Sequence, residues 1–273
     1  MGVVAVAAVT ACGAGPSSGA ATRVSTGPDV LASAYGSTTS AGSADESLSM
    51  RISTASGATT TVQAAGSFQW KPLLGSMTET LDTPSGSMML PIRLVGTDIY
   101  VELPSQAASQ LGGKRWIKAS IAELAGSGGP SQFDPTQELA LLSAHAQSVK
   151  SQGPATVDRV PTTHYRAVLD LSKAGATSVS QPILSRLEAL IGTNLLPVDV
   201  WIDHSGRLVQ LTMDMTVRSA PQGASSAVVS QFPVAETITV SLSHYGVPVT
   251  ASPPPADQVS TIDLSQILQG AGL

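Results

Sequence analysis

The sequence predicts an α+β fold in which helices pack on one face of a large antiparallel sheet. Along most of the chain, apolar and polar residues alternate with a period of two, which is typical of half-buried strands. Only two or three segments change to the helical period, and they interrupt the series of strands instead of following each strand. Apolar residues make up 42% of the 273 residues, which is enough for a substantial core.

The first half of the chain predicts five consecutive strands. The period-two pattern runs through 47–53, 60–70, 77–81, 88–94 and 99–103. Turn-forming residues separate the segments, as at Ser56-Gly57 and Pro84-Ser85-Gly86. We therefore expect neighbouring segments to pair as antiparallel hairpins.

The clearest alternation lies between Val209 and Val217, where every second residue is apolar. This pattern indicates a strand with one buried and one solvated face, as in an antiparallel sheet covered on one side only. Its expected partner is 198–202, joined to it through the hairpin loop Asp203–Gly206. The segments 163–171 and 238–242 predict two further strands.

Two segments predict amphipathic helices. Pro135–Val149 follows Asp134, a favourable N-cap, and has proline at the first helical position. Pro182–Ile191 is shorter and is followed by Gly192, a typical C-terminal helix residue. A brief helix is also expected at Asp263–Leu268.

Composition and charge exclude several classes of function. The chain has 14 basic and 19 acidic residues and a formal net charge of −5, which disfavours binding to nucleic acid. After the N-terminus, no apolar run approaches the roughly 18 residues that span a bilayer, which argues against a channel or transporter. The single cysteine excludes a disulfide within the chain.

The N-terminal residues predict export and lipidation. The run Val3–Val9 has the length of a signal-peptide apolar region, and Val9-Thr10-Ala11-Cys12 fits a bacterial lipobox. In a lipobox the thiol receives a diacylglyceryl group, and a peptidase that accepts only small residues cuts before the cysteine. No Lys or Arg precedes the run, so we expect the natural start to lie a few codons upstream. The alternative is an incidental thiol in a flexible tail.

The domain organisation follows from these patterns. Residues 1–11 are expected to form the signal peptide. Residues 12–43, rich in Gly, Ser, Thr and Ala, are expected to form a lipidated flexible tether with at most a short helix around 29–35. Residues 44–273 are expected to form a single domain.

Motifs for catalysis or metal binding lack their required context. Gly15–Gly19 has the letters of a nucleophile elbow but no preceding strand or following helix. Asp199 and Asp203 flank Trp201 and are best interpreted as solvated strand charges. None of the four histidines has a second His or Cys at ligand spacing; they are His145, His164, His204 and His244. We therefore expect no enzymatic activity, no metal and no cofactor.

Four segments carry a resemblance to a known family. They are Gly113–Lys118 (GKRWIK), Thr162–Arg166 (TTHYR), Pro197–Asp203 (PVDVWID) and His244–Val249 (HYGVPV). In this order, and together with the lipobox, they resemble actinobacterial lipoproteins of the LppX, LprA, LprF and LprG type, which are related in fold to the LolA carrier. The resemblance covers roughly residues 44–262. It implies a large curved antiparallel sheet, an unclosed half-barrel, with helices in its concave face and an apolar cavity that holds acyl chains in several members.

The leading hypothesis is therefore a membrane-anchored lipoprotein on the extracytoplasmic side of the cell membrane. It would bind lipid or lipoglycan acyl chains in a hydrophobic cavity during lipid transfer in the envelope, and it is expected to be a monomer. Seven Met and only three Phe give an aliphatic, pliable interior. Apolar-face residues expected to line the cavity, with plain core as the alternative for each, are Met50, Ile52, Met88, Leu90, Ile92, Leu184, Leu187, Leu190, Leu211, Met213 and Met215.

Two other functions fit the same sequence. One is an envelope binding or regulatory lipoprotein of the same fold that acts through a protein partner and holds no internal ligand. The other is a hydrolase of envelope glycolipids, which requires a Ser, a His and an acid that converge in space.

Overall fold

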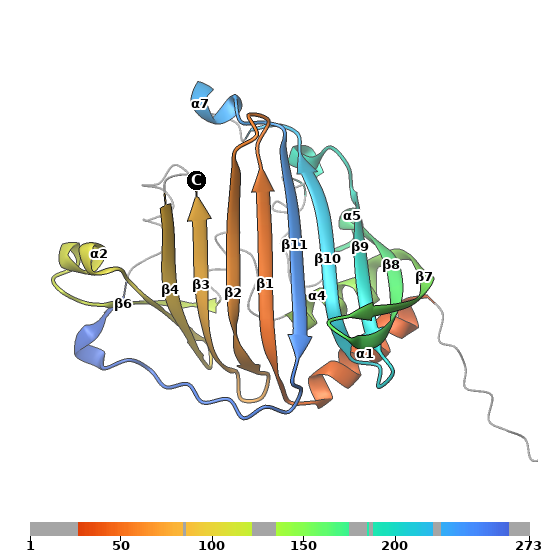
Figure 1. Ribbon diagram of the computed structural model, residues 1–273, viewed down its shortest axis with the longest axis horizontal. Helices are drawn as coiled ribbons and strands as arrows, with labels where there is room; N and C mark the ends of the chain where they lie inside the picture. The colour runs from red at the N-terminus through yellow and green to blue at the C-terminus, as the bar shows by residue number, and fades with distance from the viewer. Residues whose placement is uncertain are drawn as a thin grey trace, which may run out of the picture.

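The computed structural model describes residues 27–83, 86–121, 135–174, 185, 188–220 and 225–261. Twelve strands in this part of the chain form one sheet (Figure 1). In chain order the elements are α1 (Pro28–Ser40), β1 (Ser43–Ser53), β2 (Thr59–Gln69), β3 (Leu74–Thr83), β4 (Gly86–Val95), β5 (Asp98–Glu102), α2 (Ser105–Gln110), β6 (Trp116–Ser120), α4 (Pro135–His145), β7 (Ala146–Val157), β8 (Val160–Asp170), α5 (Leu171–Ala174), β9 (Leu195–Asp203), β10 (Leu208–Val217), α7 (Ser226–Val229), β11 (Val234–Ser243), the 3-10 turn η1 (Ala256–Gln258) and β12 (Val259–Thr261).

The sheet is open and almost entirely antiparallel. Its strand order is β12-β6-β5-β4-β3-β2-β1-β11-β10-β9-β8-β7, and only the pair β12–β6 is parallel. The predicted α+β half-barrel is confirmed, as are the nine strands expected from the period-two pattern. The strands β6, β7 and β12 were not expected.

Residue pairing between strands defines two faces of the sheet. Leu48 of β1 pairs with Val240 of β11, Val240 with Leu211 of β10, and Leu211 with Val200 of β9. Directly paired residues project to the same side of a sheet, so these four buried side chains share one face. We call this side the inner face and the opposite side the outer face.

Helices α1 and α4 cover the inner face in the β7–β10 half of the sheet. They pack against each other, and both contact β7; α1 also contacts β10, and α4 contacts β8 (Figure 1). Leu31 of α1 and Leu139 and Leu142 of α4 belong to the same buried cluster as Val200 and Leu211. The core therefore lies between the two helices and this half of the sheet.

Helix α1 corrects the expected extent of the tether. It occupies residues 28–40, inside the segment 12–43, and its Leu31 and Ala34 are fully buried. The buried Thr38 also holds the sheet, because its hydroxyl oxygen accepts a hydrogen bond of 2.9 Å from the backbone N–H of Leu208. Residues 28–40 therefore belong to the folded body, and composition misled the prediction because Ser, Thr, Ala and Gly make up much of this helix.

The helix expected at 135–149 is also shorter than predicted. It ends at His145, and the chain continues directly into β7, so Ala146 and Val149 belong to a strand. Both residues fit either period, and pairing of β7 with β8 decides the outcome. Of the helix expected at 182–191, the described part is helical at 188–191 and is followed by Gly192 with φ 73°. The helix expected at 263–268 lies outside the described residues.

The C-terminal segment connects the two halves of the sheet. After β11 the chain runs along one end of the sheet and returns to pair β12 with β6 (Figure 1). Arg93 of β4 fixes this segment on its way, since its Nη1 donates to the carbonyl of Ser252 at 3.2 Å. Within the described residues, no helix combines the length and apolar character needed to cross a membrane.

The burial of α1 gives a direct prediction. Leu31→Ala should lower the free energy of unfolding by about 2–5 kcal/mol, because it leaves a cavity in the core. Ser33→Ala, at an exposed position of the same helix, should change it by less than about 0.5 kcal/mol. Urea denaturation followed by circular dichroism measures both. Equal stability of the two variants would show that residues 28–40 belong to the tether and not to the folded core.

Candidate functional site

A continuous row of apolar side chains crosses the inner face. The row follows direct residue pairing through nine adjacent strands, from β4 to β7. Its members, in spatial order, are Met88, Leu81, Val62, Met50, Ile238, Met213, Val198, Ala167 and Val149. We call this set the apolar row. An apolar strip of this length needs cover, either from the protein itself or from a ligand.

Exposure changes along the apolar row. Val198 and Ala167, in the half beneath α1 and α4, are fully buried. In contrast, Leu81, Val62, Met50, Ile238 and Met213 are only partly buried, and Met88 is 44% exposed. The incompletely covered part of the row therefore extends from β4 to β10.

The eight strand residues expected to line a cavity all lie on the inner face. Met50, Met88 and Met213 are in the apolar row itself. Leu90 and Leu211 lie in the next row on one side, and Ile52 and Met215 lie in the next row on the other side. Ile92 lies one row further and, like Leu211, is buried in the core. Whether these residues line a ligand cavity stays a prediction.

The helical residues of that prediction are only partly described. Leu190 is half-buried, and its carbonyl accepts a hydrogen bond of 2.8 Å from the backbone N–H of Arg218. Leu184 and Leu187 lie outside the described residues.

Three members of the apolar row were missed as site residues. They are Val62, Leu81 and Ile238, which pair directly with Met50 or with each other. Each already belonged to a predicted strand, so the alternating pattern contained the signal. What the sequence lacked was the register between strands, which alone determines which residues share a row.

Two carboxyl groups flank the apolar row. Glu79 of β3 pairs with Leu90 and Ala64, one row to one side, and Glu236 of β11 pairs with Ile52 and Met215, one row to the other side. Burial raises the pKa of both glutamates above the ordinary value. A raised pKa favours the uncharged form, which can donate a hydrogen bond beside an apolar ligand.

The two histidines in the resemblance motifs each contact a carboxylate. His164 Nε2 lies 2.7 Å from Asp199 Oδ1, its ring stacks on Trp201, and Arg166 binds both oxygens of the same carboxylate. Asp199 is therefore a shared partner on the outer face. The expectation of a merely solvated charge at Asp199 is wrong, because the neighbouring strand β8 brings both His164 and Arg166 to it.

Among the described residues, neither His164 nor His244 has an acid on one ring nitrogen and a hydroxyl on the other, the relay that a hydrolase requires. His244 Nδ1 lies 2.9 Å from Asp45 Oδ2 and 3.5 Å from Ser243 Oγ, so the acid and the hydroxyl meet the same ring nitrogen. A serine hydrolase instead uses opposite nitrogens, one for the acid and one for the nucleophile. Within the described residues, no three His, Cys, Asp or Glu side chains gather to hold a metal ion.

Comparison with known proteins adds two relatives. The chain is 27% identical over 214 residues to an uncharacterised 31.2 kDa protein of Streptomyces griseus, a match that covers 72% of this chain and 64% of that protein. It is also 27% identical over 267 residues to a Streptomyces coelicolor protein named as a candidate lipoprotein, covering 90% of this chain and 79% of the relative. No family model matches the chain.

Solved structures of similar fold include two mycobacterial lipoproteins. Lipoprotein LppX of Mycobacterium tuberculosis aligns with a TM-score of 0.48 at 19% identity, covering 82% of this chain and 99% of that one. LprF of Mycobacterium bovis aligns with a TM-score of 0.45 at 15% identity, covering 84% and 97%. At these identities the likeness concerns the fold alone. Both proteins are of the lipoprotein type that the four sequence segments resemble.

The flanking glutamates predict a pH dependence of stability. The folded-state pKa values of both glutamates exceed the unfolded value. Their contribution to the free energy of unfolding is therefore most favourable at low pH and is lost as pH rises through the raised pKa. Glu79→Gln with Glu236→Gln should therefore raise stability at pH 7 by under about 1 kcal/mol, because both groups keep some solvent contact. The gain should vanish near pH 4.

Urea denaturation at several pH values tests this prediction. Asp82→Asn, an exposed outer-face change on the same strand as Glu79, is the matched control and should produce no such gain. A double variant that is less stable than the native chain at pH 7 would contradict the raised pKa of the two glutamates.

Proposed function

We propose that the inner face binds the acyl chains of a lipid or lipoglycan and that the protein is an exported lipoprotein held at the membrane through Cys12. The observation that supports acyl binding most strongly is the partly exposed section of the apolar row, from Met88 to Met213. It offers a ligand an aliphatic surface six strands wide.

Burial of apolar surface would drive acyl binding on this face. Each 100 Å² of apolar surface removed from water contributes about 2.5 kcal/mol. An acyl chain laid along the row would cover side chains of Met50, Val62 and Ile238 and would remove its own surface from water as well. Three methionines in the row add a pliable contact that suits chains of variable length and branching.

The polarity of the inner face favours the hydrocarbon part of a lipid over its head group. In β1–β4 and β9–β11, no Lys or Arg occupies an inner-face position. A phosphate placed on the row would therefore meet the glutamates Glu79 and Glu236 without a cation to compensate. An uncharged glutamic acid, by contrast, can hydrogen-bond an ester or hydroxyl of the ligand.

A charged residue placed in the apolar row tests acyl binding. Met50→Lys should weaken binding of a fluorescent fatty acid at least about tenfold, because the ammonium must stay hydrated where the chain would lie. Ser49→Lys is the matched control, since this neighbouring residue is exposed on the outer face. Fluorescence titration of delipidated protein measures both, and native mass spectrometry reports lipid retained on purification.

Equal affinity of the two variants, or no acyl binding by the native chain, would contradict the proposal. In that event, stoichiometric capture of an envelope protein from detergent extracts would favour the regulatory alternative instead.

The proposed anchor has its own test. Cys12→Ala should abolish the diacylglyceryl modification and release the protein from the membrane fraction, because the thiol is the only acceptor in the chain. Mass spectrometry of the N-terminal peptide and detergent phase partitioning measure the two effects. Unchanged partitioning of the variant would show that something other than lipidation holds the protein.

A further inference from the structure

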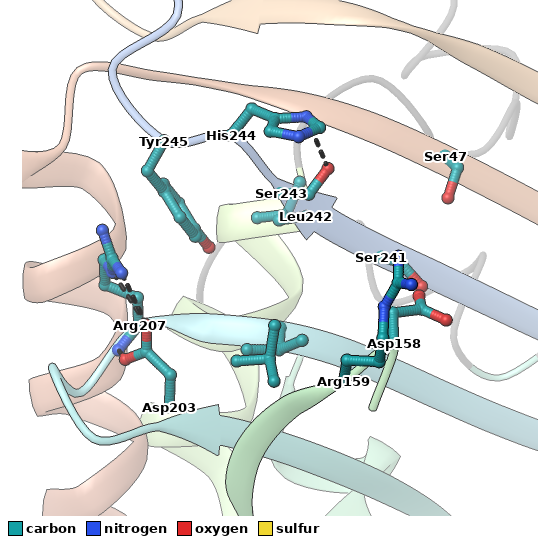
Figure 2. Close-up of a pocket in the computed structure, with 12 residues that line it drawn as sticks. Ser47, Asp158, Arg159, Asp203, Arg207, Ser241, Leu242, Ser243, His244 and Tyr245 are labelled. Carbon is teal, nitrogen blue, oxygen red and sulfur yellow. Dashed lines mark hydrogen bonds and ion pairs between the residues drawn. The ribbon is translucent and has the colours of Figure 1, made fainter. Parts of the chain in front are cut away.

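A hollow of about 500 Å³ opens at one end of the outer face. Its walls come from β1, β10 and β11, from the β9–β10 loop and from the tip of the β7–β8 hairpin, which reaches over the outer face (Figures 1 and 2). We call it the outer cleft. Its volume falls within the range of ligand pockets, and the sheet separates it from the apolar row.

Backbone strain concentrates at this cleft. Three non-glycine residues in the described part of the chain have positive φ: Asp158 at 47°, Arg159 at 69° and His244 at 44°. All three line the outer cleft. Such conformations cost free energy and persist where the surrounding structure or a function requires the side chain.

Arg159 is the least expected of the three. It and Asp158 form the two-residue loop between the paired residues Val157 and Val160. A loop with positive φ at both positions favours Asn-Gly, because only glycine adopts this backbone at the second position without strain. An arginine at this position lowers the stability of the turn. The guanidinium of Arg159 lies at one side of the cleft, opposite Arg207 (Figure 2).

Several polar groups of the cleft are available to a ligand. Ser47 and Ser241, directly paired on the outer face, form no side-chain hydrogen bond with another described residue, nor do Asp158 and Arg159. The remaining charges are already occupied. Arg207 binds Asp203 through Nε and Nη2 at 2.9 and 2.8 Å and lies over the ring of Tyr245.

The free groups combine hydroxyls, one carboxylate and one guanidinium around an apolar lining of Val160, which is 38% exposed, and Val209. We propose that the outer cleft binds a neutral saccharide, either free or as the head group of a glycolipid. Sugar hydroxyls both donate and accept, so they match Asp158 and Arg159 together with the serines. The C–H faces of the sugar ring would pack on the two aliphatic residues.

Charged ligands fit the cleft less well. An anion that reached Arg159 would meet Asp158 beside it, on a chain of net charge −5. A cation would face both Arg159 and Arg207. The site is distinct from the acyl-binding surface, because Ser47, Ser241 and the tip of the β7–β8 hairpin lie on the outer face of the sheet, and either function can fail without the other.

Chemical-shift mapping on the full ¹⁵N-labelled chain tests the inference. Maltotriose and trehalose serve as free saccharides, octyl glucoside below its micelle concentration as the glycolipid probe, and inorganic phosphate as the anion. We expect the saccharides or octyl glucoside to shift the amides of 157–160 and 241–245. Shifts with the free sugars identify a free-saccharide site, and shifts there with octyl glucoside alone identify a head-group site.

The decisive variant is Arg159→Gly. Glycine relieves the strain at φ 69°, so the melting temperature should stay unchanged or rise, while saccharide affinity should fall roughly tenfold. Lys150→Ala removes an exposed cation from the same hairpin outside the cleft and should leave binding intact. No saccharide-induced shifts in the native chain, a response to phosphate alone, or undiminished binding by Arg159→Gly would each overturn the inference.

Discussion

The antiparallel register is the constraint on which the rest of the structure depends. Because pairing brings Met88, Val62, Met50 and Met213 into one line, apolar side chains from separate strands merge into a single surface. A slip of one residue between any two strands would interrupt that line with an outer-face residue such as Ser49 or Thr239. The register therefore makes the apolar row continuous across the inner face.

Helices α1 and α4 determine how that surface divides between core and candidate site. Where they pack, the row is sealed, and Val198 and Ala167 become ordinary core residues. The hydrogen bond from Leu208 N–H to Thr38 Oγ1 fixes α1 over this half. The same sequence pattern thus serves stability in one half of the sheet and leaves contact surface in the other.

The sequence was most informative where periodicity alone decides the structure. Alternation was sufficient to predict nine strands. It also predicted that the eight strand residues of the proposed cavity share one face of the sheet. It failed at β7, where Ala146 and Val149 suit both periods and pairing with β8 makes the choice, and at α1, where buried Leu31 and Ala34 stand among small residues. Val62 and Ile238 were missed because register is a property of pairs of strands, which no single segment specifies.

The two faces are connected by a local irregularity in β10. Pairing shifts by one residue between Leu208 and Gln210, so Val209 has no direct partner in β9. Without this bulge, Leu208 and Leu211 would project to opposite sides; with it, both are buried on the inner face. The extra residue, Val209, lines the outer cleft. One inserted residue therefore completes the core on one side and supplies an apolar contact on the other.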